Sequence, residues 1–286
     1  MSLSILNNIS ALQAENQLTL TSAAAAKSLQ QLSSGSRINS GSDDAAGLAI
    51  SDGLNANVAA LNQSSLNATN AVGALQTADG ALSQISSLLN RSVTLATEAS
   101  NSGLSLNQSK AIDTEFQALL SQITNISSST SFNGAKLFGS TVTAFTSDGT
   151  NNVSIGNTVA ASGSTDLGLG VVTTGTTTNL VANLTGATSA AGATAAQAAL
   201  ALITAAISTV SAERGTLGAT VEQLHSASAV NTNESENLKS ASSNITSADI
   251  STVVANDTKY SILQQTGISA LQQANQQAQS VLKLLQ

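Results

Sequence analysis

The side chains that could do chemistry are few and lie far apart in the sequence. The single histidine is His225, and the chain has no cysteine. A lone imidazole cannot complete a metal-ligand set or a Ser-His-Asp triad, so we interpret His225 as a structural residue. A zinc protease motif of the HExxH type needs two histidines and is therefore excluded.

A pair of carboxylates could share general acid-base work, and Asp43 and Asp44 are adjacent. They follow a short polar run that starts at Ser40 and precede a long helical pattern. This position is typical of a helix N-terminus, where carboxylates accept hydrogen bonds from free N–H groups and face the positive end of the dipole. Residues 168–170 lack the strand and the further glycine of a dinucleotide-binding motif. The sequence therefore predicts no catalytic, cofactor-binding or metal site.

The composition indicates helices and protein contacts. Among 286 residues, 9% are charged and 2% aromatic, proline is absent, and the net charge is −7. Absence of proline permits long helices, because proline costs about 3 kcal/mol in a helix interior. The acidic balance disfavours nucleic-acid binding, which uses clustered Lys and Arg. The sequence shows neither the pattern of a cleaved secretory signal nor a run of 18 apolar residues, so we expect no membrane insertion.

Apolar residues recur in alternating steps of four and three along three segments, the pattern of heptad-repeat helices. We predict helices from Asp44 to about Asn101, over 112–126 and over 203–245. Short turns between successive helices favour antiparallel packing. After Leu224 the third repeat contains Ser and Asn, and we expect this part to pack loosely or against another element. The core of the resulting rod should include Leu54, Val58, Leu61, Leu75, Phe116 and Val221.

Residues 140–190 have a different character, rich in Thr, Gly, Val and Ser. Residues 141–146 and 152–155 favour strands and flank Asp148–Gly149, which predicts a β-hairpin. The stretch 160–200 is low in complexity and is either a surface tip or poorly ordered. The predicted fold is mainly α, with long antiparallel helices whose heptad seams form a rod, plus a small central β-hairpin region.

Both ends of the chain combine low charge with aliphatic residues at helical spacing. Glu15 is the single charged residue in 1–26, and Lys283 is the single one in 264–286. An isolated amphipathic helix is marginal in water, so each end must pair, either with the other end or with copies of itself. The proposed assembly residues are Ile5, Ile9, Leu12, Leu263, Leu271, Leu282 and Leu285.

Residues 29–40, followed by 43–50, closely resemble the N-terminal signature of bacterial flagellin. Residues 131–134 resemble the turn by which that family enters its β-hairpin. The C-terminal runs 262–267, 273–276 and 281–285 are similar to the end of the same family. The resemblance covers both ends and most of the helical core, and leaves about 140–200 unmatched in detail.

The resemblance implies a structural subunit, not an enzyme, that self-assembles into the hollow helical filament of the bacterial flagellum for motility. Residues 1–34 with 250–286 would form a terminal coiled coil lining the inner tube. Residues 35–249, including the hairpin and a tip at about 140–190, would form the outer tube. Only about 60 residues separate Gly139 from Leu200, so we expect a minimal form without large outer domains.

The partners implied by the resemblance are further copies of the chain, the flagellar type III export apparatus, an export chaperone, and the hook-junction and cap proteins. Export would deliver the chain to the extracellular filament without a cleaved signal peptide. Two alternatives stay open on the sequence: a hook-filament junction protein and a non-flagellar coiled-coil scaffold or adhesin.

One segment also resembles the part of flagellin that an animal Toll-like receptor recognises. The residues carried over as receptor contacts are Arg91, Leu95 and Glu115. An Arg, an apolar neighbour and a carboxylate together resemble a small interface hot spot. Ser92 and Thr94 stand where charged residues are common in strongly recognised members, so weaker recognition is expected.

Overall fold

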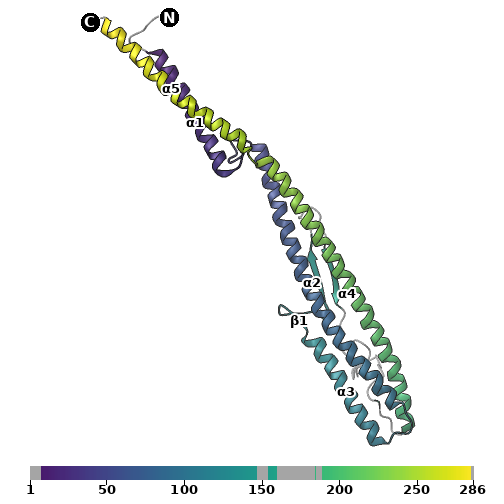
Figure 1. The fold of residues 1–286 in the computed structure, drawn as a ribbon. Helices are drawn as coiled ribbons and strands as arrows, with labels where there is room; N and C mark the ends of the chain where they lie inside the picture. The colour runs from purple at the N-terminus through teal and green to yellow at the C-terminus, as the bar shows by residue number, and fades with distance from the viewer. Residues whose placement is uncertain (1–7, 147–153, 160–183, 185–188, 285–286) are drawn as a thin grey trace. The chain divides into compact units, whose positions relative to one another are not determined.

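The computed structural model describes residues 8–146, 154–159, 184 and 189–284. These residues form five helices and two small antiparallel strand pairs, which confirms the predicted mainly α class (Figure 1). The chain divides into two compact units, residues 1–56 with 236–286 and residues 57–235, and each is described by itself. The elements are α1 (Ile9–Ser34), α2 (Ala45–Ala99), α3 (Leu106–Ser129), β1 (Ser131–Phe132), β2 (Ala135–Lys136), β3 (Ser140–Phe145), β4 (Ser154–Val159), α4 (Ser189–Thr246) and α5 (Ile250–Leu284).

In the unit of residues 57–235, α2, α3 and α4 contribute to one apolar core. Helices α2 and α4 are antiparallel, because Ser65 bonds Ser228 at 2.7 Å and Asp79 pairs with Arg214 at 2.8 Å. Of the six predicted rod-core residues, Leu75 and Phe116 lie in this core and Val221 packs against it. Leu61, Leu75 and Phe116 are fully buried, while Val58 and Val221, and Leu54 in the other unit, are half-buried.

The polar half of the α4 heptad packs on α2 through hydrogen bonds, which corrects the expectation of loose packing. Besides the Ser65–Ser228 bond, the Ser235 hydroxyl donates to Asn62 Oδ1 at 3.1 Å. Short hydroxyl side chains let the helices approach closely and satisfy each other across the interface. Asn231 is 5% exposed, and its side-chain nitrogen has no hydrogen-bond partner among the described residues.

Capping and turn residues place the ends of α3 and the strands that follow. Ser105 and Gln108 form a capping box at the start of α3. Between β1 and β2, Asn133 and Gly134 have φ of 50° and 80°, the two positive values that a tight type I′ hairpin turn requires. The residues that resemble the family's turn thus form a small hairpin of their own.

The central hairpin is present as β3 paired antiparallel with β4, with Thr143 opposite Gly156. Its predicted turn at Asp148–Gly149 lies outside the described residues. Helix α4 begins at Ser189, so the end of the low-complexity stretch is helical instead of irregular, because Ala196 and Ala199 are buried in the core. Residues 160–183 and 185–188 also lie outside the described residues.

One helical segment, Gly192–Thr246, is long and apolar enough to cross a membrane by length and composition alone, with a mean hydropathy of 1.6 in its most apolar window. A core helix of a soluble protein meets the same criterion. Only 28% of that window is buried, although Ile203, Ala206 and Val210 in this helix belong to the core formed with α2 and α3.

Candidate assembly surface

The described parts of the two chain ends pair with each other within one subunit, which is one of the two alternatives left open by the sequence. Helices α1 and α5 lie side by side and antiparallel (Figure 1). The Asn8 side-chain nitrogen donates to the Ala274 carbonyl at 3.1 Å, and Gln264 donates to the Ser22 hydroxyl at 3.4 Å. Asn8 also caps α1, because its side-chain oxygen accepts from the Ala11 N–H at 3.1 Å. The side-chain amide of Asn8 therefore both caps the N-terminus of α1 and links α1 to α5.

The pairing faces of α1 and α5 consist largely of small and polar residues. Their members recur at heptad spacing and are buried or half-buried, whereas the positions between them are mostly exposed. Such faces allow close approach of the helices but bury little apolar area. They are Ala11, Ala14, Leu18, Thr21, Ala25, Ser28 and Leu32 on α1, and Val253, Asp257, Tyr260, Gln264, Gly267, Leu271 and Ala274 on α5.

Large aliphatic side chains on α1 are left outside this pair. Ile9, Leu12 and Leu20 are 60%, 58% and 65% exposed. At 100° per residue they fall on the side of α1 opposite its pairing face. We call Ile9, Leu12 and Leu20 the open face of α1. The described residues of the subunit therefore leave this stripe uncovered.

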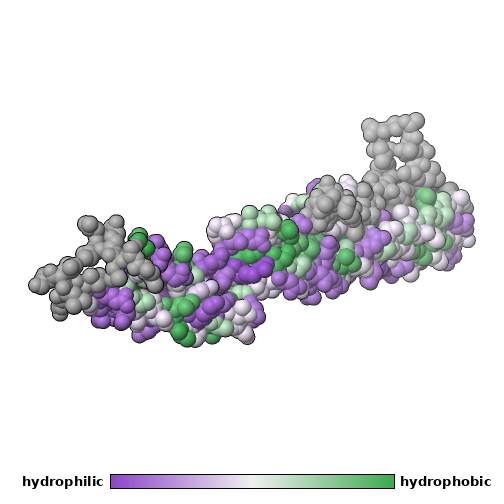
Figure 2. Space-filling view, turned by 90° about the horizontal axis from the view of Figure 1, so that it is seen from above, coloured by the Kyte–Doolittle hydropathy of each residue, from purple (hydrophilic) through white to green (hydrophobic). Residues whose placement is uncertain are grey.

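Helix α5 leaves aliphatic side chains uncovered as well. Ile262, Leu263 and Ile268 are 61%, 41% and 48% exposed, whereas Leu271 is half-buried on the pairing face. Burying the exposed part of one such side chain gains roughly 1 kcal/mol. Figure 2 shows one face of the molecule, where hydrophobic side chains reach the surface in patches between hydrophilic ones. Ile5, Leu285 and the side chain of Leu282 lie outside what the structure describes.

Backbone hydrogen bonds join the link between α1 and α2 to the link between α4 and α5. Gly35 ends α1 in the left-handed conformation, with φ of 69°, which glycine adopts without strain. Its carbonyl accepts from the Ala248 N–H at 3.0 Å, and the Arg37 N–H donates to the Thr246 carbonyl at 2.6 Å. The Arg37 guanidinium donates to the Ile245 carbonyl at 2.9 Å. We call this set of contacts the junction clasp.

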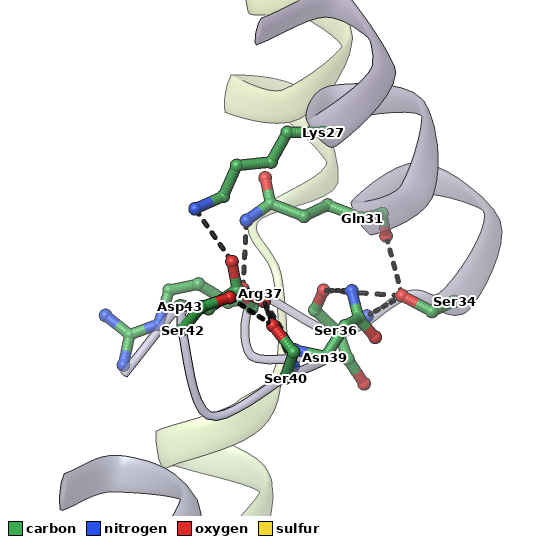
Figure 3. A network of polar contacts seen from close by, with 9 residues as sticks. All are labelled: Lys27, Gln31, Ser34, Ser36, Arg37, Asn39, Ser40, Ser42 and Asp43. Atoms are coloured by element: carbon green, nitrogen blue, oxygen red, sulfur yellow. Dashed lines mark hydrogen bonds and ion pairs between the residues drawn. The ribbon is translucent and has the colours of Figure 1, made fainter. Parts of the chain in front are cut away.

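Asp43 holds the α1–α2 link in shape (Figure 3). Lys27 contacts its Oδ1 at 2.8 Å, and the N–H groups of Asn39 and Ser40 each donate to Oδ2 at 3.1 Å. The Lys27 hydrogen bond, followed by the Asn39 N–H, lowers the pKa of Asp43 from 3.8 to about 2. The carboxylate is thus held ionised by donors at both oxygens.

Asp44 has a separate role at the start of α2. Its Oδ1 accepts from the Gly47 N–H at 2.9 Å, which confirms the helix-capping interpretation for Asp44. The interpretation is wrong for Asp43, which accepts from the Asn39 and Ser40 N–H groups before the helix. A side chain at Gly47 would displace its neighbours, because a Cβ would lie 2.6 Å from Asp44 Oδ2 and 2.7 Å from Ile38 Cδ1. Sequence reasoning missed Lys27 and Arg37, since no local spacing links either residue to its partners.

The three residues proposed as receptor contacts separate into two groups. Arg91 and Glu115 are exposed and joined by hydrogen bonds of 2.9 Å from Nε and 2.6 Å from a terminal nitrogen. Leu95, in contrast, is 2% exposed and belongs to the core, so it is corrected from a surface contact to a packing residue. The Arg91–Glu115 pair therefore lies on the surface of α2 and α3, whereas Leu95 is not available there as an apolar contact.

His225 is exposed on α4. Within the described part of the chain, no three His, Cys, Asp or Glu side chains come together in a way that could hold a metal ion.

Comparisons with known proteins match almost the entire length. A family model of the bacterial flagellin N-terminal helical region matches residues 5–143, and one of the bacterial flagellin C-terminal helical region matches residues 200–285. The flagellin of Listeria monocytogenes is 34% identical, covering 97% of this chain and 98% of its own. The flagellin of Bacillus subtilis is 33% identical, covering 98% of each.

Two further flagellar proteins are also similar to this chain. The flagellar filament 30.7 kDa core protein of Treponema maltophilum is 32% identical, again covering 98% of each chain. A crystal structure of Bacillus cereus flagellin is 24% identical with a TM-score of 0.47, and the alignment covers 57% of this chain and 87% of that one.

Proposed function

The chain belongs to the bacterial flagellin family and is a structural subunit of the flagellar filament, and we propose that its paired terminal helices line the inner tube of that filament. Residues 1–34 and 250–286 form this inner domain, and residues 35–249 form the outer tube. The observation that carries the proposal is the open face of α1: the α1–α5 pair leaves Ile9, Leu12 and Leu20 uncovered.

Assembly of the filament would bury the aliphatic side chains that the single subunit leaves exposed. The open face of α1 and the exposed Ile262, Leu263 and Ile268 of α5 meet different surfaces on neighbouring copies, and such heterologous contacts continue along a helix instead of closing a ring. Low charge at both ends suits this arrangement. An unpaired charge closed into a tube of repeated copies would be desolvated at a cost of several kcal/mol.

The filament lies outside the cell, and we propose that the chain reaches it through the flagellar type III export apparatus, with an export chaperone, and without a cleaved signal peptide. At the hook end of the filament the chain would contact the hook-junction proteins, and at the tip it would contact the cap protein. Marginal terminal helices support this route, because an end that folds only on assembly can be exported unfolded.

Recognition by an animal Toll-like receptor is proposed for the exposed Arg91–Glu115 pair on α2 and α3. A guanidinium in a fixed fork with an adjacent carboxylate offers both a donor and an acceptor to a partner. The burial of Leu95 leaves this surface without an apolar anchor, which supports weak recognition.

Electron microscopy of the purified chain at increasing concentration tests the proposed function. We expect long tubes of uniform diameter above a critical concentration. Discrete dimers or short bundles at every concentration would instead support a coiled-coil scaffold and count against a filament subunit.

A further inference from the structure

A hollow opens in unit 57–235 beside two glycines in the middle of α4. Gly215 and Gly218 line it on one side, and Leu75, Leu217 and Val221 supply its apolar wall. Its volume is about 440 Å³. Leu75 and Leu217 themselves are buried, so the hollow reaches the edge of the hydrophobic core.

Nothing within the described chain requires glycine at these positions. Both residues are helical, and neither has the positive φ found at Gly35, Gly134 and Gly139. A Cβ built on either one meets no other atom within 4 Å. Each glycine nevertheless destabilises a helix interior by about 1 kcal/mol relative to alanine. Because Gly215 and Gly218 have no side chains, the hollow that they line is left unfilled by the described residues.

The chemistry of the hollow suits an uncharged apolar occupant. At its edge, Arg214 Nε donates to Asp79 Oδ1 at 2.8 Å, and this hydrogen bond raises the pKa of Arg214. Each charge is therefore neutralised by the other. A second, more open hollow of about 530 Å³ is lined by α4 alone between Ala219 and Val230 and, at 100° per residue, lies on a different side of that helix.

We propose that this hollow is a socket for an apolar side chain of a second copy of the chain, a neighbouring subunit in the filament. The inference rests on the proposed function, since in a homopolymer the surrounding surface is supplied by copies. Those copies carry apolar side chains that are open in the subunit: Leu66 and Phe145, in the same unit, are each 59% exposed. An apolar side chain from a neighbouring copy would be buried against the apolar wall of the hollow. The charges at its edge, Arg214 and Asp79, are already paired with each other, so neither would be desolvated without a partner.

Substitutions that fill the hollow should change polymerisation without destabilising the folded subunit. In Gly215→Leu and Gly218→Leu, the new side chains gain helix propensity and occupy the hollow. We expect a melting temperature equal to or above that of wild type, together with a critical concentration for polymerisation raised about tenfold, the effect of overpacking an interface. Gly80→Leu on α2 is the matched control, because Gly80 also has open space around it but does not line the hollow. It should polymerise as wild type does.

Each outcome decides the matter. If both leucine variants polymerise at the wild-type critical concentration, the hollow does not receive a side chain of a neighbouring subunit. A hollow that binds a different protein would give this same result and would also refute the proposal. If leucine lowers the melting temperature, the double variant Gly215→Ala/Gly218→Ala is compared with Gly80→Ala, and an equal critical concentration again overturns it. A wild-type chain that forms no filament at all refutes the proposed function, and the socket with it.

Discussion

Leu18 of α1 packs directly on Gly267 of α5, where a Cβ would lie 3.2 Å from Leu18 Cδ1. Gly267→Val should therefore push the terminal helices apart, at an overpacking cost of about 1–3 kcal/mol, and raise the critical concentration for polymerisation. Sedimentation of filaments measures this. Gly53→Val on α2 is the control, since nothing lies within 4 Å of that position. Equal polymerisation of the two variants would show that the close approach is not needed for assembly.

Removal of residues 267–286 should abolish polymerisation and leave the helices of unit 57–235 folded. Those helices have their own apolar core, whereas the removed segment carries Gly267, Leu271 and Ala274 of the α5 pairing face. Circular dichroism reports the folded part and sedimentation reports filaments. Filaments built from the truncated chain would contradict an inner-tube role for α5.

Leu61→Asp and Leu75→Asp should destabilise unit 57–235 by several kcal/mol, because each places a carboxylate without a partner in the core. Leu61 is 1% and Leu75 0% exposed. Leu66→Asp provides the control on the same helix, since Leu66 is 59% exposed. Thermal unfolding measures the difference, and a melting temperature like that of Leu66→Asp in either core variant would mean that the heptad register is wrong.

Acid should weaken the α1–α2 link through Asp43. Its pKa falls from 3.8 to about 2 on folding, so the folded state favours the ionised form. The stabilisation is fully present above pH 3.8 and is lost as the pH falls through about 2. Asp43→Asn should flatten this part of the stability profile, with Asp52→Asn as the charge control. An NMR titration should also show that Lys27→Met raises the Asp43 pKa; an unchanged value would exclude Lys27 as the main cause.

Arg91→Ala should weaken binding of the monomer to the flagellin-sensing Toll-like receptor by at least about 1 kcal/mol, the usual threshold for a residue that matters at an interface. Lys110→Ala, an exposed cation on α3, is the control. Leu95→Ala should instead lower the melting temperature, because Leu95 is buried. Identical binding by wild type and Arg91→Ala would remove the pair from the receptor site.

The heptad positions of the helical core could be predicted because large residues such as Leu82, Phe116 and Leu217 recur in steps of four and three, and all three are fully buried. The pairing of the chain ends could not be resolved in the same way. Its contact face contains residues such as Ala11 and Ser28, whose small side chains give a weak hydrophobic signal, while the conspicuous Ile9 and Leu12 face outwards. In this protein, the strongest aliphatic pattern at the ends marks what the subunit leaves open.

The junction clasp and the candidate receptor surface could not be predicted from the sequence for a different reason. The contact between Arg37 and Ile245 spans 208 residues, and no local rule links such positions. Leu95 lies next to a predicted heptad position, Ala96, and the sequence alone does not show that both turn inwards. The boundary of α4 also escaped prediction, because Ala-rich sequence near Ala196 is compatible with a helix or an irregular tip.

The junction clasp has a consequence for how much chain the subunit can carry. Because Gly35 and Ala248 are bonded, the polypeptide leaves the terminal helices and returns to them at one place. Loop-closure entropy grows only with the logarithm of length, so doubling the intervening chain would cost the clasp only about 0.6 kcal/mol. Peptides or whole domains grafted into the central segment should therefore leave the terminal helices free to polymerise, which makes the chain a natural carrier for surface display.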